Sequence, residues 1–162
     1  MGVFMAKNYD KSYNRKNNEQ DRTIDNIILE LNRLDSLSEL KPKKYADEDG
    51  YADKIAKNFS KGRDDSQKLN SNQLRKFFGA IRDIESKDGD WEEIEPQFYL
   101  LKPKLAVSVG RKLIPKDFHK LMMACMKKVD VGDDVGEKMK NFKTLVYFLE
   151  AIVAYSKYHD QR

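Results

Sequence analysis

The 162-residue chain contains one cysteine and two histidines, and its apolar residues form no long runs. A single cysteine cannot form a disulfide within the chain, which suits the reducing cytoplasm. No apolar run approaches the roughly 18 residues that a membrane-spanning helix needs, and residues 1–21 lack the apolar core of a secretory signal. We therefore expect a cytoplasmic protein that does not partner a membrane.

The scarcity of cysteine and histidine also limits the chemistry. His119 and Cys125 are six residues apart, which places them about 120° apart around one helix, so they cannot form a nucleophile–base pair there. No cysteine–histidine cluster has metal-ligand spacing, and no Walker-type phosphate loop occurs. We expect no catalytic residue, metal or cofactor. Cys125 belongs in the core, His119 at the surface or an interface, and His159 in a frayed helix end.

An acidic stretch from Asp88 to Glu95 contains five carboxylates. One hypothesis is a small metal-dependent nuclease that uses them. The simpler interpretation is that Asp90 caps a helix and that the glutamates favour its positive N-terminus. The acidic stretch could then face a basic neighbour.

Charge is abundant and segregated. Charged residues make up 36% of the chain and the net charge is +4, whereas an average domain has about 25% charged residues. Between Phe98 and Lys128 there are eight basic residues and one acid, Asp117. Such segregation is typical of a surface that meets phosphate groups.

Apolar residues recur at helical spacing, and no segment alternates as a strand would. We predict an all-α fold, a compact bundle of about five or six helices in a single domain over residues 22–162, after a mobile polar arm over residues 1–21. The predicted helices are Thr23 to about Leu40, Ala46–Ser60, Ser71–Ser86, Trp91–Lys112, Pro115–Val129 and Val135–Tyr158. Pro103 either starts a new helix or kinks a long one. The last helix is apolar over more than half its circumference, so it is either central in the core or shared with a second chain.

One predicted helix carries two arginines around a glycine. Arg75, Gly79 and Arg82 share a face of the helix over residues 71–86. Gly79 costs about 1 kcal/mol relative to alanine inside a helix, and it offers close approach to a neighbour. Two arginines beside such a spot could straddle a phosphate backbone. The alternatives are a solvated face or a close helix–helix contact at Gly79.

The following helix shows a similar arrangement. Lys104, Ser108 and Arg111 share a face, Lys112 is adjacent, and Lys102 precedes Pro103. The alternative is an ordinary basic surface. Because no sheet-based RNA-binding motif occurs, we expect contacts to phosphates and sugars, with little base reading and a steep salt dependence.

Three stretches, read in order, resemble a known family. They are Leu69–Phe78, Leu100–Val107 followed by Gly110 and Arg111, and Phe148–Tyr155. Together they resemble the small subunit of the type III-A CRISPR interference complex, the Csm complex, over roughly Tyr45–Tyr158. The resemblance implies a helical protein that stacks as a short filament along the crRNA and its paired target RNA, beside the backbone subunits and with the large subunit at one end. It implies no catalytic activity, because target cleavage belongs to the backbone subunit.

The resemblance and the charge pattern together define a set of candidate RNA contacts. Those in the family's patterned stretches are Arg75, Lys76, Lys102, Lys104 and Arg111, and charge and helix face add Lys61, Arg63, Arg82 and Lys112. We expect a non-catalytic small subunit that binds RNA through backbone phosphates during antiviral RNA interference. Its partners would be crRNA and target RNA, the backbone and large subunits, and neighbouring copies. The alternative is a helical scaffold or homodimeric interaction protein without direct RNA contact.

Overall fold

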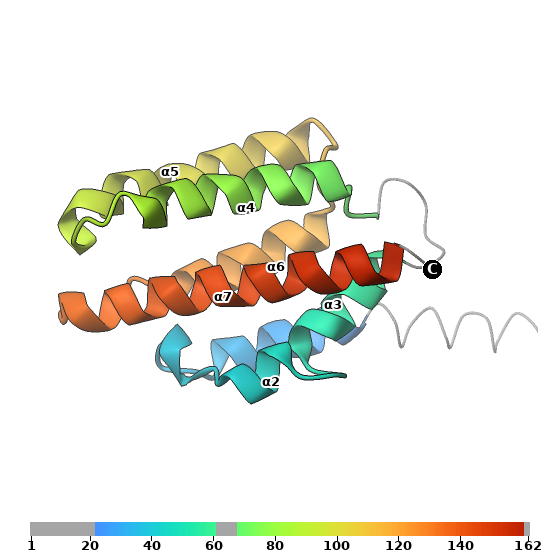
Figure 1. The fold of residues 1–162 in the computed structure, drawn as a ribbon, viewed down its shortest axis with the longest axis horizontal. Helices are drawn as coiled ribbons and strands as arrows, with labels where there is room; N and C mark the ends of the chain where they lie inside the picture. Colours follow the sequence, from blue (N-terminus) through green and yellow to red (C-terminus); the bar gives the residue numbers. More distant parts are fainter. Residues whose placement is uncertain (1–21, 61–67, 161–162) are drawn as a thin grey trace, which may run out of the picture.

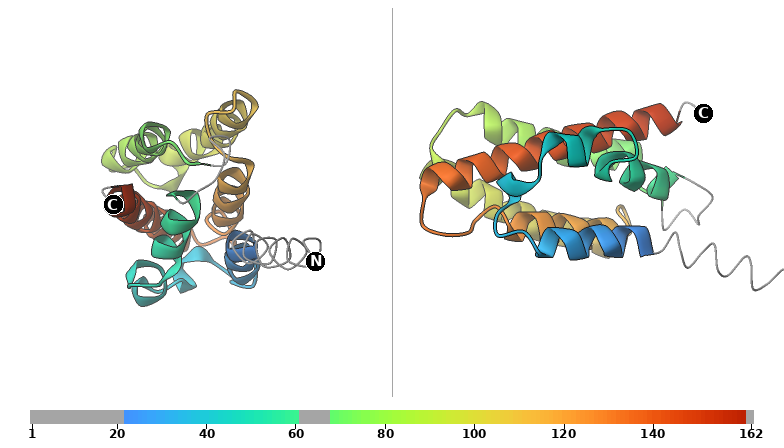
Figure 2. Two further views of the ribbon diagram at one scale, coloured as in Figure 1. Left: turned by 90° about the vertical axis from the view of Figure 1, so that its right-hand side faces the viewer. Right: turned by 90° about the horizontal axis from the view of Figure 1, so that it is seen from below.

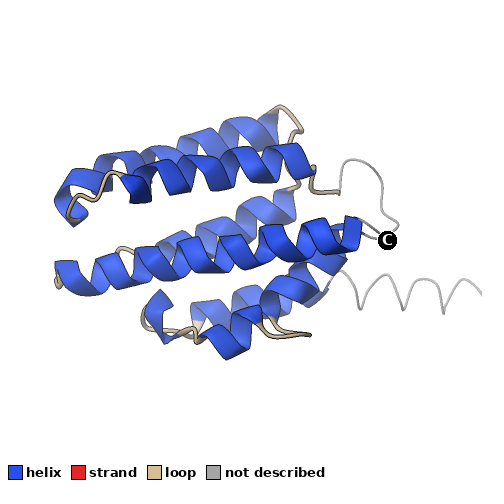
Figure 3. Cartoon of the chain, viewed as in Figure 1, coloured by secondary structure: helices blue, strands red, loops and turns tan. Residues whose placement is uncertain are grey.

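The computed structural model describes residues 22–60 and 68–160. These residues form helices and contain no strand, which confirms the predicted all-helical class (Figure 3). The elements are a helix over residues 22–32, η1 (Leu37–Glu39), α2 (Pro42–Ala46), α3 (Tyr51–Ser60), α4 (Ser71–Ser86), α5 (Trp91–Gly110), α6 (Lys116–Lys127) and α7 (Val135–Asp160). The predicted arm over residues 1–21 lies outside the described residues, as do Lys61 and Arg63.

The long helix α7 runs through the middle of the bundle (Figure 1). It packs against α2, α3, α4, α5 and η1, and its side chains Phe142, Leu145, Phe148, Leu149 and Ile152 are fully buried. This burial explains why its apolar residues cover so much of its circumference. Of the two interpretations of this helix, the central position within the chain is the one that the structure shows.

Two groups of helices enclose α7. The antiparallel pair α4 and α5 lies on one side of it, and α2 and α3 lie on the other (Figures 1 and 2). Helix α6 lies beside the helix over residues 22–32 in both views of Figure 2. Edge-to-face contacts of Phe118 in α6 with Phe59 and Phe77 join α6 to α3 and α4.

The first helix ends at residue 32, so the prediction that it continues to about Leu40 is wrong. Ser36 has extended backbone angles, and the next backbone groups bond to distant parts of the chain. The Leu37 N–H donates to the Lys128 carbonyl at 2.9 Å, and the Ser38 N–H donates to Oδ1 of Asn141 at 2.8 Å. Asn141 is fully buried, and its Nδ2 donates to the Val129 carbonyl. Tertiary partners therefore replace the helical ones.

The predicted helix over residues 46–60 is divided into α2 and α3 by a turn. Pro42 begins α2 at its first turn, where a missing N–H costs nothing. Asp49 adopts a left-handed conformation with φ of 57°. A Cβ at Gly50 would lie 2.8 Å from the carbonyl oxygens of Lys44 and Asp47. The turn therefore requires a glycine at position 50.

The later helices follow their predicted limits closely. Helix α4 is capped by Asn70, the residue before its first residue Ser71, and the Asn70 side chain accepts from the Asn72 N–H. Asp90 caps α5 as predicted, by accepting from the Glu93 N–H at 3.0 Å. Helix α5 continues through Pro103, so this proline starts no new helix. The helix ends at Gly110, two residues before the predicted end at Lys112.

Candidate nucleic-acid interface

The α4–α5 hairpin brings together basic residues that are far apart in the sequence. The two helices are antiparallel and contact each other, so the first turns of α4 lie beside the last turns of α5 (Figure 1). Arg75 and Lys76 belong to the beginning of α4, whereas Lys104 lies in the last turns of α5 and Arg111 caps its C-terminal end. Arg82 lies about 10 Å further along α4 than Arg75, at 1.5 Å per residue.

Most of the predicted contacts are exposed and electrostatically unpaired. Within the described part of the chain, no ion pair involves any of the exposed residues Arg75, Lys76, Lys104, Arg111 or Lys112. Lys112 follows the end of α5 and has a left-handed φ of 58°. It therefore does not continue the helix face on which Lys104 and Arg111 were placed.

The α4 face around Gly79 is open. A Cβ built at Gly79 would meet no atom within 4 Å, apart from its own helix backbone and chain neighbours. This rules out a close contact with another described helix as the reason for the glycine. The neighbouring Arg82 lies over the ring of Phe78 at 5.9 Å from its centroid, a cation–π arrangement that leaves the guanidinium exposed.

Lys102 differs from the other described candidates because it is partly buried, although its charge, like that of Arg82, lies over an aromatic ring. Its Nζ lies 4.7 Å above the ring of Tyr99, whose hydroxyl donates to Asp130. That hydrogen bond is the main cause that raises the pKa of Tyr99 to about 12. Partial burial acts to raise the pKa of Asp130, but hydrogen bonds from Tyr99 and Lys138 lower it overall. The hydroxyl of Ser108, on the same helix, is also engaged within the chain, because it donates to the Lys104 carbonyl at 3.0 Å.

Apolar side chains lie among the basic residues of α5, which the charge-based prediction missed. Leu100 and Val107 are each 56% exposed. With Lys104 they occupy positions i, i+7 and i+4 of one helix face. A mixed apolar and basic face is typical of a contact with a protein partner.

A second missed feature is a cleft between α4 and α7. It is lined by Ser71, Leu74, Arg75, Val153, Ser156, Lys157 and Asp160. The cleft places Lys157 beside the predicted contact Arg75. Sequence reasoning could not find it, because no local signal shows that the start of α4 packs on the end of α7.

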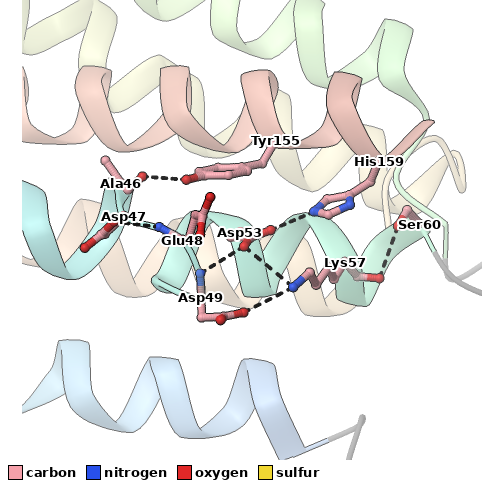
Figure 4. Close-up of polar contacts among 9 residues, drawn as sticks. All are labelled: Ala46, Asp47, Glu48, Asp49, Asp53, Lys57, Ser60, Tyr155 and His159. Atoms are coloured by element: carbon pink, nitrogen blue, oxygen red, sulfur yellow. Dashed lines mark hydrogen bonds and ion pairs between the residues drawn. The ribbon is translucent and has the colours of Figure 1, made fainter. Parts of the chain in front are cut away.

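The third missed feature is a buried histidine–aspartate pair, drawn in Figure 4. Nε2 of His159 donates to Oδ1 of Asp53 at 2.6 Å, and the two side chains are 6% and 7% exposed. The Asp49 N–H donates to Oδ2 of Asp53, and Lys57 lies 3.6 Å from the same oxygen. The prediction that His159 lies in a frayed helix end is therefore wrong. Its hydrogen bond to Asp53 holds the end of α7 against α3. Tyr155 adds a hydrogen bond to the Ala46 carbonyl at 2.7 Å.

This pair has the residue types of a catalytic base, but the described part of the chain supplies no serine, threonine or cysteine nucleophile in the cleft beside it. The adjoining cleft is lined by Glu48, Asp49, Asp53, Lys57, Ala154, Tyr155, Tyr158 and His159, with no serine, threonine or cysteine. Cys125 is fully buried as predicted, and burial raises the pKa of its thiol to about 12. Among the described residues, no group of three or more potential ligands could hold a metal ion, and no helix has the length and apolar character to cross a bilayer.

The comparison with protein families identifies a family that covers most of the chain. The family described as Csm2 Type III-A matches residues 42–162, which is most of the chain. No curated protein and no solved structure gave a significant match. The match contains all of α2 to α7, and with them the α4–α5 hairpin and both clefts. The chain therefore belongs to the Csm2 family, the small subunit of the type III-A CRISPR Csm complex.

Proposed function

We propose that this Csm2 chain is a non-catalytic RNA-binding subunit, which contacts backbone phosphates through the exposed arginines and lysines of α4 and α5. The observation that carries the proposal is the open α4 face, on which Arg75 and Arg82 are exposed beside a Gly79 that no other described helix approaches. A side-chain-free spot between two cations accommodates a sugar–phosphate chain. The RNA would be crRNA and its paired target.

The position of the basic residues supports binding inside an assembly. Arg75, Lys76, Lys104 and Arg111 gather toward one end of the hairpin, and a single such patch makes few phosphate contacts. Neighbouring copies would repeat the patch along the RNA, so that weak contacts add up. The backbone and large subunits would complete the cytoplasmic complex. Among the described residues, no serine, threonine or cysteine lines the cleft beside His159, which supports a structural rather than a catalytic subunit.

The test is RNA binding by the assembled Csm complex at several salt concentrations. Arg75→Ala and Arg111→Ala should each weaken binding to all target sequences equally, and each should reduce the slope of log K against log salt by about 1. Lys43→Ala, an exposed lysine on α2, is the matched control and should change neither quantity. Unchanged affinity and slope in both arginine variants would contradict the proposal.

A second candidate function is a helical scaffold without direct RNA contact. The exposed Leu100 and Val107 favour it, because they give α5 an apolar surface suited to protein. In that case the α5 cations would form the polar rim of a protein contact. The salt dependence of RNA binding distinguishes the two functions. If the chain is a scaffold, the slope of log K against log salt does not change when Arg75 or Arg111 is neutralised.

A further inference from the structure

The cleft between α4 and α7 gathers polar side chains from two distant parts of the chain. Its volume is about 230 Å³, and Ser71 and Arg75 of α4 line it together with Ser156 and Lys157 of α7. Within the described ranges, none of these four side chains has a hydrogen-bonding or ionic partner. Two cations and two hydroxyls therefore converge on one space with their donors unused by the protein.

The donor set matches an oxyanion. Arginine and lysine supply charge-assisted donors, and serine hydroxyls donate to the same kind of oxygen. Ser71 is also the first residue of the 16-residue helix α4, whose positive N-terminal end adds to the attraction for an anion. These features together favour a phosphate group over a neutral ligand.

The net charge of the cleft distinguishes between kinds of phosphate. Arg75 and Lys157 contribute two positive charges, and Asp160 contributes one negative charge, so the sum is +1. A phosphodiester carries one negative charge, whereas a terminal phosphate carries close to two at neutral pH. The apolar atoms of Leu74 and Val153 also line the cleft, and they would suit the carbon atoms of an adjoining ribose.

We propose that this cleft binds one phosphodiester of an RNA backbone, held by Arg75 and Lys157 and by the hydroxyls of Ser71 and Ser156. The inference rests on the proposed RNA-binding function and adds α7 to the RNA-contacting surface. Lys157 becomes a specific contact that neither the charge pattern nor the family resemblance singled out. Asp160 acts in the opposite sense and limits the affinity of the cleft.

The test compares, in the assembled complex, one variant that removes a positive charge from the cleft with one that removes a negative charge. Lys157→Ala should weaken RNA binding about tenfold, as expected for one lost charge-assisted contact, and it should reduce the salt slope by about 1. Asp160→Asn should tighten binding by roughly two- to fivefold, because it removes the repulsion between a carboxylate and a phosphate. Lys157→Arg should retain affinity, and Lys43→Ala should behave as wild type. Circular dichroism checks that each variant folds.

A comparison with Arg111 separates the inference from the proposed function, since Arg111 does not line the cleft. If Arg111→Ala weakens binding while Lys157→Ala and Asp160→Asn match the Lys43→Ala control, the inference is wrong and the proposed function stands. If none of the variants alters affinity or slope, both are wrong. Opposite effects of Lys157→Ala and Asp160→Asn support the inference whatever Arg111→Ala does.

A second measurement distinguishes a phosphodiester from free phosphate. In the isolated protein at constant ionic strength, a dinucleotide such as ApA should shift the amide resonances of Ser71 and Asn72, and the Lys157→Ala variant should lose the shift. Inorganic phosphate should give a smaller shift at equal concentration. A larger response to inorganic phosphate, or a dinucleotide shift that persists in Lys157→Ala, would overturn the assignment.

Discussion

The carboxylate of Asp53 holds the end of α7 against α3. It accepts hydrogen bonds from His159 and from the Asp49 backbone, and Lys57 lies nearby. Burial alone would raise the pKa of Asp53, but these donors stabilise its ionised form more strongly and lower the pKa below its ordinary value. A carboxyl whose pKa is lower in the folded state stabilises the fold above its unfolded pKa of about 3.9, and this stabilisation is lost as the pH falls through the folded value.

Asp53→Asn should therefore lower the free energy of unfolding at pH 7 by about 1–3 kcal/mol, since it removes hydrogen bonds to a buried charge. Urea unfolding at a series of pH values measures the effect. The difference between wild type and variant should shrink as the pH falls below about 4. Asp49→Asn is the control, because the Asp49 side chain is 81% exposed and its ion pair with Lys57 contributes little. A constant difference across the pH series would contradict this role of Asp53.

At the scale of the elements, two glycines differ in the space around their Cα atoms. Gly50 lies in the turn between α2 and α3, where a Cβ would meet two carbonyl oxygens at 2.8 Å. Gly79 lies inside α4, where a Cβ would meet nothing within 4 Å. The first glycine is thus required by the fold, whereas the second is not required by it and lowers the stability of its helix.

The same substitution should therefore have opposite effects at the two positions. Gly79→Ala should raise the free energy of unfolding by up to about 1 kcal/mol, because alanine favours the helix. Gly50→Ala should lower it by about 1–3 kcal/mol, the usual cost of forcing an atom into filled space. Chemical denaturation of the two variants checks both signs. A loss of stability in Gly79→Ala would show that the α4 face is not open.

The helices after residue 70 could be predicted because their signals are local. Asp90 caps α5, and apolar periodicity marks α4 and α6. The end of the first helix could not be predicted, because Asn141, more than a hundred residues away, accepts a hydrogen bond from the Ser38 N–H. For the candidate site too, local properties could be predicted and contacts between distant parts of the chain could not. Exposure of Arg75 follows from its helix face, but its proximity to Lys157 depends on how α4 packs against α7.

At the scale of the whole molecule, the outer surface of α5 exposes apolar side chains to solvent. Leu100→Asp should change the free energy of unfolding by no more than about 0.5 kcal/mol, because Leu100 is 56% exposed. It should nevertheless reduce co-purification with the other Csm subunits, because it places a charge in an apolar contact. Leu29→Asp is the matched control, since Leu29 is 55% exposed on the helix over residues 22–32. Equal recovery of both variants in the complex would exclude α5 as a contact.

The central position of α7 also determines when the protein can fold during its synthesis. Every other described helix precedes α7 in the chain, yet α3 and α4 bury their apolar faces against it. Until the ribosome has released the residues of α7, α3 and α4 expose the surfaces that α7 covers in the described structure. At about 5–20 residues per second, the 26 residues of α7 take seconds to synthesise. The nascent chain is therefore most susceptible to aggregation and proteolysis in that interval, and completing α7 closes the core in a single late step.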